Sequence, residues 1–386
     1  MVFLLLAMLL LWAFYTVVIY YYNSSWRAMP DYQPKNIIIP NIRFSVIIPA
    51  RNEESNIGRL LESLSNQTYP GDLFEIIVVD DHSADATAEV VRKFEKVKLI
   101  QLTDSGINSY KKKAIERGIV AAQNEWIVCT DADCMAGPEW LHTFASFIED
   151  HDPVFIAAPV MFFPSSPEGE GMVRKDSFGG VKYIFQALDF LTLQGITAAS
   201  VSTKKHNMCN GANLGYKRDV FYEVGGFKGI DKIASGDDML LMYKIWKQYP
   251  DRIAYLKSKD VIVETEATAT WKAFINQRIR WASKAKSYDD KRIFAVLLLV
   301  YLFNFSFLVL LVASFFNTGY LYAFMSFWIL KTAVEYPFVS SVSKFFNLQQ
   351  LMKYFFFFQP LHVAYTILAG FLGSFGKYEW KGRRVK

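Results

Sequence analysis

Residues 125–134 read Glu-Trp-Ile-Val-Cys-Thr-Asp-Ala-Asp-Cys, and this stretch decides the fold. Its four apolar residues, Trp126 to Cys129, predict a strand that is buried on both faces. Two carboxylates, Asp131 and Asp133, follow where that strand should end. Ligands of an open α/β sheet bind beyond the carboxyl ends of its strands, and carboxylate oxygens suit Mg²⁺ or Mn²⁺. The stretch alone allows either a metal site or a solvated surface turn.

Strands and helices alternate on both sides of this stretch. Short apolar runs predict strands over residues 44–49, 73–79, 97–102 and 154–160. Amphipathic segments between them predict helices over residues 52–64, 83–94, 111–122 and 138–148. Further along, the pattern predicts a strand over 209–216 and helices over 218–224, 237–248 and 268–285. This alternation is typical of a mostly parallel sheet with helices on both faces.

The composition leaves room for a membrane part. The chain has 386 residues, of which 52% are hydrophobic, so it can hold two domains or one domain plus membrane segments. Its net charge of +5 is modest, and its Lys and Arg lie beside apolar segments. That placement suits an anionic membrane surface better than nucleic acid, so no nucleic-acid partner is expected. The three cysteines form no C-x-x-C pair and indicate reduced thiols in the cytoplasm.

The N-terminus predicts a membrane span. Residues 2–22 carry no charge and are long enough to cross about 30 Å of hydrocarbon. The run lacks a basic start and a small-residue cleavage site, so a removable signal peptide is not expected. Arg27, Lys35 and Arg43 follow, which places the downstream side in the cytoplasm. The alternative is a buried core helix.

The C-terminal hundred residues predict further spans. Residues 294–316, 320–340 and 354–375 are each about long enough to cross a bilayer. Lys331 and Glu335 lie four residues apart and are expected to pair on one helix face, against protein. If the first span leads into the cytoplasm and three more spans follow, the C-terminal tail lies outside. The five Lys and Arg of that tail favour the inside. The sequence leaves open which segment is re-entrant or interfacial.

Five stretches occur in the order found in the inverting family-two glycosyltransferases. They are Phe-Ser-Val-Ile-Ile-Pro-Ala-Arg-Asn-Glu-Glu (44–54), Val-Val-Asp-Asp-His-Ser-Ala-Asp-Ala-Thr (78–87), Asp131-Ala132-Asp133, Ser235-Gly-Asp-Asp-Met-Leu-Leu241 and Gln277-Arg-Ile-Arg-Trp281. The resemblance covers roughly residues 42–285, and Asp237 stands where Glu is more usual. The last stretch is similar to a signature of cellulose, hyaluronan and poly-N-acetylglucosamine synthases and of several lipid glycosyltransferases. The resemblance implies an α/β, Rossmann-like GT-A domain.

The resemblance, together with the hydropathy pattern, implies a division of the chain. It comprises a transmembrane helix over 1–26, a linker over 27–41, a GT-A domain over 42–265, an amphipathic interfacial helix over 266–290, a transmembrane region of two or three spans over 291–376 and a basic tail over 377–386. The Trp380-Lys-Gly-Arg run of the tail also resembles carotenoid- and ceramide-type lipid glycosyltransferases over a short stretch.

The same resemblance implies a donor site at the strand ends. The nucleotide-sugar residues are Pro49, Ala50, Glu53, Asp80, Asp81 and Asp131. Asp81 accepts the imide N–H of a uracil base, and Asp133 is the direct ligand of Mg²⁺ or Mn²⁺, with Asp131 nearer the ribose or donor sugar. Asp80 and Asp81 can equally belong to a helix-capping turn. Of the three consecutive lysines that start at residue 111, Lys112 and Lys113 are favoured as partners of the diphosphate, although a solvated basic turn explains them equally.

The resemblance also implies the reacting and acceptor groups. Asp238 is the general base, and Asp237 raises its pKa by like-charge repulsion. Two acids at a helix start can instead stabilise the helix dipole. The acceptor and diphosphate residues are Asn213, Gln277, Arg278, Arg280 and Trp281. Arg280 offers a phosphate clamp and Trp281 a stacking face, and a membrane-surface helix with basic and Trp anchors explains the same pattern.

These expectations define three classes of function. The first is a membrane-bound, metal-dependent, inverting transferase that moves a hexose from a UDP-type donor to a lipid acceptor. It acts at the cytoplasmic face of the inner (plasma) membrane and is a multi-pass protein. The second is a processive polysaccharide synthase with a glycan acceptor, which the Gln277–Trp281 pattern favours. The third is a scaffold that binds nucleotide sugar without turnover.

Overall fold

The structure, a computed structural model, describes residues 2–34, 40–104, 106, 109–163, 180–205, 208–233, 235–284, 290–375, 378–380 and 383–385. The chain divides into two compact units. The sheet unit comprises Met29–Phe163, Ser200–Glu266 and Val385–Lys386, and the helical unit comprises Met1–Ala28, Pro164–Ala199 and Ala267–Arg384. The predicted linker and basic tail lie partly outside the described residues.

The sheet unit is built on a seven-stranded sheet with the order β3-β2-β1-β4-β8-β6-β9. Its strands are β1 (Phe44–Ala50), β2 (Phe74–Asp80), β3 (Val97–Gln101), β4 (Trp126–Cys129), β6 (Phe155–Ala157), β8 (Leu214–Lys217) and β9 (Ile253–Tyr255). Among these seven strands, β8 alone runs antiparallel to its neighbours. The prediction of a mostly parallel α/β sheet is therefore confirmed.

The centre of this sheet is fully buried. Phe44, Ile47 and Trp126, on the adjacent strands β1 and β4, are each 0% exposed. Such unbroken apolar runs are typical of parallel strands that are covered by helices on both faces. A side chain at Gly118, in helix α4 (Tyr110–Ala121), would place its Cβ 2.6 Å from Cγ2 of Ile47. The glycine therefore lets α4 pack directly on β1.

Five more helices and a small sheet complete this unit. The helices are α2 (Ile57–Ser65), α3 (Thr87–Arg92), α5 (Trp140–His151), α7 (Arg218–Glu223) and α8 (Asp237–Gln248). The small sheet has the order β5-β10-β7, with β5 (Cys134–Ala136), β10 (Val263–Glu266) and β7 (Val160–Phe163). The helix predicted from residue 52 begins only at Ile57, because Asn52 has a left-handed φ of 51° and lies in a turn. The strand predicted over 154–160 is two strands, β6 and β7, in different sheets.

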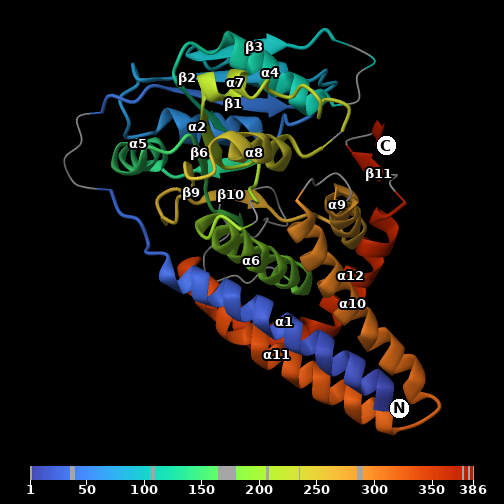
Figure 1. Cartoon of the computed structure of the whole chain (residues 1–386). Helices are drawn as coiled ribbons and strands as arrows, with labels where there is room; N and C mark the ends of the chain where they lie inside the picture. The colour runs from blue at the N-terminus through green and yellow to red at the C-terminus, as the bar shows by residue number, and fades with distance from the viewer. Residues whose placement is uncertain are drawn as a thin grey trace. The chain divides into compact units, whose positions relative to one another are not determined.

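The helical unit contains the long apolar helices. Its elements are α1 (Val2–Ala28), most of α6 (Val181–Ser202), α9 (Trp271–Ser283), α10 (Lys291–Ser314), α11 (Gly319–Phe345), the 3₁₀ helix η2 (Gln349–Tyr354), α12 (Phe355–Gly373) and the short strand β11 (Tyr378–Trp380), which pairs with β12 (Arg383–Val385). Helix α1 packs along α11 and α10, although more than 250 residues separate it from them (Figure 1). In this unit, distant segments of the chain form one bundle.

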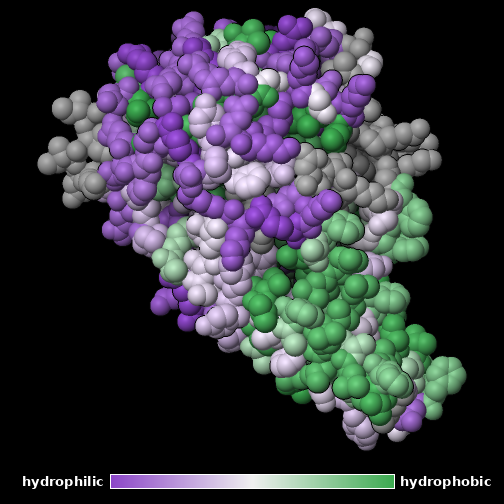
Figure 2. All heavy atoms as spheres, viewed as in Figure 1, coloured by the Kyte–Doolittle hydropathy of each residue, from purple (hydrophilic) through white to green (hydrophobic). Residues whose placement is uncertain are grey.

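Four of the described helical segments are long and apolar enough to cross a membrane: Val2–Ala28, Val181–Ser202, Lys291–Ser314 and Gln349–Gly373. Helix α11, predicted as a span over 320–340, is not among them, because Lys331 and Glu335 lower its mean hydropathy. Helix α6 is among them but is largely buried. Apolar side chains gather on the visible face of the helical unit (Figure 2), and Phe3 and Phe315 are 90% and 84% exposed.

Lys331 and Glu335 form the predicted ion pair, with Nζ 2.6 Å from Oε1. Gln359 of α12 accepts from Lys331 at 2.6 Å and donates to Glu335 at 2.6 Å, and the Tyr15 hydroxyl of α1 also donates to Glu335. Lys331 is 0% exposed. The cluster therefore pairs a buried charge within the bundle, as a charge among apolar helices requires.

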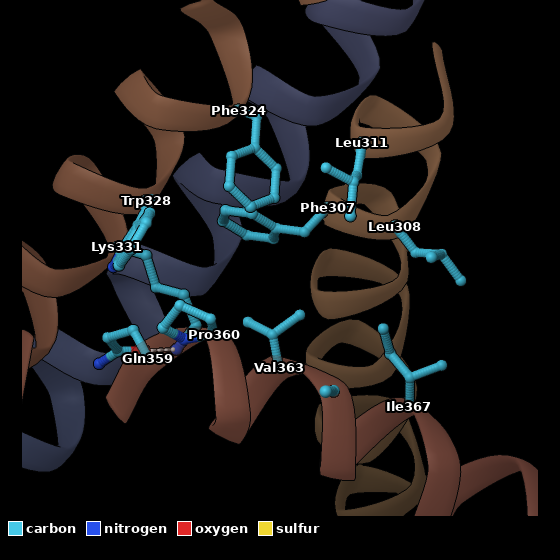
Figure 3. Close-up of a pocket in the computed structure, with 11 residues that line it drawn as sticks. Phe307, Leu308, Leu311, Phe324, Trp328, Lys331, Gln359, Pro360, Val363 and Ile367 are labelled. Atoms are coloured by element: carbon cyan, nitrogen blue, oxygen red, sulfur yellow. Dashed lines mark hydrogen bonds between the residues drawn. The ribbon is translucent and has the colours of Figure 1, made fainter. Parts of the chain in front are cut away.

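A pocket with almost entirely apolar walls lies between α10, α11 and α12 (Figure 3). Phe307 and Trp328 form part of its wall, and the buried Lys331 and Gln359 adjoin it. Leu311 of α10, another lining residue, is 42% exposed. The pocket therefore reaches the surface of the helical unit beside α10.

Candidate active site

Strand pairing brings the predicted donor residues to one edge of the large sheet. In the parallel register of β1 and β2, Ala50 lies beside Asp80. In the register of β1 and β4, Ile47 lies beside Cys129, so Asp131 continues to the same carboxyl edge. The antiparallel pairing of β4 with β8 places Leu214 beside Cys129. The loop before β8 therefore arrives at this edge as well.

At this edge, residues from four segments come together: Lys111 of α4, Asp131 after β4, Gly211 before β8, and Asp237 with Asp238 at the start of α8. The Nζ atom of Lys111 lies 2.7 Å from Oδ1 of Asp131 and 3.4 Å from Oδ2 of Asp237. The backbone N–H of Gly211, in the loop before β8, donates to Oδ2 of Asp238 at 3.0 Å. A Cβ at Gly211 would lie 3.3 Å from Oδ2 of Asp237 and 3.4 Å from Nζ of Lys111. The glycine therefore gives the loop room to approach the acids, and we call these five residues the acid cluster.

The charges of the acid cluster are partly shielded from water. The side chains of Lys111, Asp131 and Asp237 are 22%, 34% and 9% exposed. Burial lowers the pKa of Lys111, but the attraction of Asp131 and Asp237 outweighs it, so the pKa is raised above the usual lysine range. Lys111 therefore stays positively charged and offsets part of the negative charge of Asp237.

The start of α8 fixes Asp237 and Asp238. Gly236, the residue before the helix, has a φ of 77°, which glycine adopts without steric cost. This turn places both acids in the first helical turn, where the dipole favours negative charge. Oδ1 of Asp238 accepts the N–H of Met239 at 2.7 Å, while its Oδ2 accepts from Gly211. Both carboxylate oxygens of Asp238 are therefore held by backbone donors.

The predicted nucleotide-binding acids lie at the end of β2. Asp81 is 3% exposed, and its Oδ1 lies 3.0 Å from Nδ1 of His82 and 3.8 Å from Nη1 of Arg51. Asp80, equally buried, accepts the N–H of Ser83 at 3.0 Å. The N–H of Asp81 donates to the carbonyl of Ala50 at 2.8 Å, which joins the turns after β1 and β2.

Glu53 and Pro49 occupy the β1 side of the same edge. Pro49 lies beside Val79 in the register of β1 and β2. Glu53 is 7% exposed; its N–H donates to Oγ1 of Thr87 at 2.7 Å, and its Oε2 accepts from Asn56 at 2.8 Å. Glu53 therefore links the β1–α2 turn to the start of α3.

Asp131 and Asp133, the predicted metal ligands, follow β4 and are both half-buried. Within the part of the chain that is described, no three His, Cys, Asp or Glu side chains come together as a metal site. Mg²⁺ is, however, often held by one or two carboxylates, with water and substrate phosphates as the other ligands. The Lys111 ammonium beside Asp131 shows that a positive charge is stabilised at this point. The two acids therefore fit a cation that a diphosphate helps to hold.

The structure separates the three consecutive lysines. Lys112 is 2% exposed and donates to the carbonyl oxygens of Ser235, at 2.9 Å, and Ile233. Lys113 pairs with Glu116 at 2.8 Å. Lys111, which the sequence did not favour, is the lysine at the acid cluster. Helical spacing does not separate Lys111 from Lys112, because they precede the buried Ile115 by four and three residues and both lie near the buried face of α4.

Asn213 lies inside the protein. It is 0% exposed, its Oδ1 accepts from Nε1 of Trp140 at 3.0 Å, and its Nδ2 donates to the carbonyls of Pro159 and Val261 at 2.8 and 2.7 Å. The side chain thus anchors the end of the loop that carries Gly211. The predicted strand over 209–216 begins only at Leu214, because residues 210–213 form this turn.

The Gln277–Trp281 stretch lies on α9, in the helical unit. The helix starts at Trp271 because Oγ1 of Thr270 caps it by accepting the N–H of Ala273 at 3.1 Å. Arg278 is 4% exposed and pairs with Asp189 of α6 at 2.5 Å, whereas Gln277, Arg280 and Trp281 are half-buried. The predicted helix end at 285 falls outside the described residues.

Residues 45–225 match the family model for glycosyl transferase family 2. Glycosyltransferase AglE from Haloferax volcanii is 29% identical over 199 residues, which are 50% of this chain and 58% of that protein. Poly-beta-1,6-N-acetyl-D-glucosamine synthase from Staphylococcus epidermidis is 24% identical over 245 residues, 62% of this chain and 53% of that protein. The chain therefore spans little more than half the length of these relatives.

A solved structure has the same fold. The mannosyltransferase PcManGT from Pyrobaculum calidifontis, in complex with GDP-Man and Mn²⁺, superposes with a TM-score of 0.59 at 19% identity. The match covers 95% of this chain and 99% of the other. Residues 45–225 of this chain are therefore a glycosyl transferase family 2 domain, and they are built on a GT-A fold.

Proposed function

We propose that the chain is a membrane-bound, inverting glycosyltransferase. It moves a hexose from a nucleotide diphosphate sugar of the UDP type to a lipid acceptor at the cytoplasmic face of the inner (plasma) membrane, which it spans several times. The observation that carries the proposal is the acid cluster, where Asp131, Asp237 and Asp238 meet around Lys111 at the carboxyl edge of the sheet. The match of residues 45–225 to glycosyl transferase family 2 supports this edge as the place for the donor.

The donor lies along the ends of β1, β2 and β4 in this proposal. Asp81 accepts the imide N–H of the base, and Pro49, Ala50, Glu53 and Asp80 line the nucleotide pocket with it. The burial of Asp81 and its contacts with His82 and Arg51 support this role, because they hold its carboxylate in one orientation.

Asp133 is the direct metal ligand in this proposal, and Asp131 lies beside it at the metal site. A bound Mg²⁺ or Mn²⁺ would neutralise the charge on the leaving diphosphate. Lys111 contributes a second positive charge at Asp131, and it replaces Lys112 and Lys113 as the proposed diphosphate partner. Those two lysines are engaged with Ser235 and Glu116.

Asp238 is the proposed general base. It accepts the proton of the acceptor hydroxyl while that oxygen bonds to the anomeric carbon and the bond from carbon to the diphosphate oxygen breaks. One displacement from the opposite face inverts the anomeric centre. The backbone donors at both oxygens of Asp238 fix its position, which supports the role because a base must be held within reach of the proton.

A lipid acceptor is supported by the helical unit. Gln277, Arg280 and Trp281, the proposed acceptor and diphosphate residues, lie on α9 in the same unit as the candidate spans. The exposed apolar side chains of that unit suit a bilayer (Figure 2). The alternative is a processive polysaccharide synthase with a glycan acceptor, which the similarity to the poly-N-acetylglucosamine synthase favours.

Product analysis separates these two functions. The purified full chain is incubated with UDP-glucose, UDP-galactose or UDP-N-acetylglucosamine, Mn²⁺ and membrane lipids, and the products are identified by mass spectrometry. A lipid that carries one sugar supports the proposal. Long polymer made from donor alone replaces it with the synthase. Absence of both products and of donor hydrolysis, in wild type and Asp238→Asn alike, removes the enzymatic assignment.

A further inference from the structure

We propose that Asp189 of α6 is a positioning residue for the acceptor, acting through Arg278 on Gln277 and Trp281. This inference rests on the proposed function of α9. It also revises the role of Arg278, which the sequence placed among the residues that contact the acceptor or the diphosphate.

Asp189 joins three elements of the helical unit. It is 6% exposed, and its Oδ2 accepts from Nε and Nη2 of Arg278 at 2.9 and 2.5 Å. Its Oδ1 accepts from the hydroxyl of Tyr365 in α12. One carboxylate therefore ties α6, α9 and α12 together, and each oxygen has a defined donor.

Arg278 in turn contacts Gln277 and Trp281, two of the residues proposed to bind the acceptor. Its Nη1 donates to Oε1 of Gln277 at 2.6 Å. Its guanidinium carbon lies 4.2 Å from the ring centroid of Trp281 and 4.5 Å from that of Phe274. A guanidinium over an aromatic face is attracted by the ring electrons. The orientations of the Gln277 amide and of the indole are thus both coupled to Arg278.

The two arginines of α9 point to different sides of the helix. At 3.6 residues per turn, Arg278 and Arg280 are about 200° apart around the helix axis. Arg278 is 4% exposed and faces Asp189, whereas Arg280 is half-buried and makes no side-chain ion pair with another described residue. Arg278 is therefore committed to the interior of the helical unit, whereas the guanidinium of Arg280 is not engaged in that ion pair.

The orienting effect of Asp189 depends on its charge and on both of its oxygens. A neutral amide in its place keeps the shape but loses the charge-assisted bonds, and one of its two polar atoms becomes a donor facing a donor. The Arg278 guanidinium then loses its fixed orientation, and the indole of Trp281 loses a fixed neighbour. An effect on Trp281 is therefore the direct signature of this role.

The first experiment measures the environment of Trp281 directly and does not depend on an activity assay. The full chain is labelled with 5-fluorotryptophan in detergent micelles, and the Trp281 resonance is assigned from its loss in Trp281→Phe. In Asp189→Asn, the ¹⁹F resonance of Trp281 shifts or broadens. Asp290→Asn is the matched control, because Asp290 is also buried and pairs with an arginine, Arg292, at 2.7 Å. An unchanged Trp281 resonance in Asp189→Asn overturns the proposal.

The second arm reads catalysis with UDP-sugar donors and diacylglycerol in phosphatidylglycerol vesicles. Asp189→Asn lowers kcat/KM for the lipid about tenfold, because misplaced positioning groups cost rate, and changes donor hydrolysis without acceptor less than about twofold. In a Gln277→Ala/Trp281→Ala background, the same substitution has an effect of less than about twofold on transfer, because both residues through which it acts are already removed. An equal factor in both backgrounds overturns the proposal.

Tyr365→Phe keeps the test open if Asp189→Asn does not fold. It removes the hydroxyl donor that holds Oδ1 of Asp189, so the carboxylate and the Arg278 guanidinium paired with it lose one constraint, and the Trp281 resonance shifts in the same direction. No shift in this variant counts against the role of Asp189. A wild type that makes no lipid product removes the proposed acceptor class instead, and leaves the fluorine arm to decide whether Asp189 orients Trp281.

Discussion

The ammonium group of Lys111 lies 2.7 Å from Oδ1 of Asp131, and it is the positive charge at the centre of the acid cluster. Lys111→Met removes that charge and leaves Asp131, Asp237 and Asp238 next to one another. A bound diphosphate then meets more negative charge, so the donor KM rises. A lost charge-assisted contact costs about 1.5–3 kcal/mol, or about a 10- to 150-fold weaker donor affinity. Initial rates against donor concentration measure this effect.

Lys113→Met is the matched control. Its amine pairs with Glu116, three residues along the same helix, and because the two side chains are 31% and 39% exposed the pair contributes little. We expect a change of less than about twofold in the donor KM, since such pairs are worth about 0.5 kcal/mol or less. Equal effects of the two substitutions would show that Lys111 has no special place at the donor.

The pKa of Lys111 predicts how its contribution depends on pH. Because the folded pKa is raised, the stabilisation is fully present below the unfolded value of about 10.4 and is lost only as the pH rises through the folded pKa. The difference in thermal stability between wild type and Lys111→Met should therefore be constant between about pH 6 and pH 9. Melting curves of both proteins at several pH values test this. A difference that declines between pH 7 and pH 9 contradicts the charge state assigned to Lys111.

The alternation of apolar runs was sufficient to predict the sheet. Strands such as β1 and β4 are apolar on both faces, and only a parallel sheet covered by helices gives them that environment. The alternation could not predict the residue at which each helix or strand begins. Asn52 and the loop before Leu214 interrupt regular structure by local backbone geometry, so the helix and the strand predicted there start later than expected.

The acids of the acid cluster were predictable because they follow apolar runs or begin a helix. Lys111 was harder, because three consecutive lysines differ only in their angle around α4. The role of Asp189 could not be predicted from the sequence, because a single acid in an apolar helix does not indicate that it pairs with Arg278, 89 residues away. Long-range pairing of this kind depends on the tertiary packing of α6 against α9.

The Lys331 cluster predicts a large loss of stability when one charge is removed. Glu335→Gln leaves the buried Lys331 ammonium without its ion pair, which should lower the free energy of unfolding by about 3–5 kcal/mol. The double substitution Lys331→Met/Glu335→Leu removes both charges and should recover most of that loss. Lys344→Met, at an exposed position of the same helix, should change stability by about 0.5 kcal/mol or less. Thermal unfolding in detergent tests this, and a double variant no more stable than Glu335→Gln contradicts it.

Asn213 predicts a structural effect in place of a binding effect. Asn213→Ala leaves the indole N–H of Trp140 and the carbonyls of Pro159 and Val261 without their bonds, at a cost of about 3 kcal/mol or more. Thermal stability should therefore fall, and the acceptor KM of the folded fraction should change little. A normal melting temperature together with a raised acceptor KM would restore the acceptor role that the sequence assigned.

Asp238→Asn separates binding of the donor from transfer of the sugar. The amide occupies the same volume and keeps an oxygen for the N–H of Gly211, so the loop before β8 stays in place; its NH2 replaces the oxygen that accepted the N–H of Met239 in α8. An amide does not accept the acceptor proton, so transfer should fall by about 10²–10⁴-fold. Donor affinity, measured by calorimetry with a UDP-sugar and Mn²⁺, should stay within about twofold of wild type, because Asp238 is assigned to the acceptor proton. Asp260→Asn, which changes an exposed acid outside the acid cluster, is the control and should leave both quantities unchanged. If Asp238→Asn weakens donor binding as much as it slows transfer, the carboxylate belongs to the donor site and the base must be sought elsewhere.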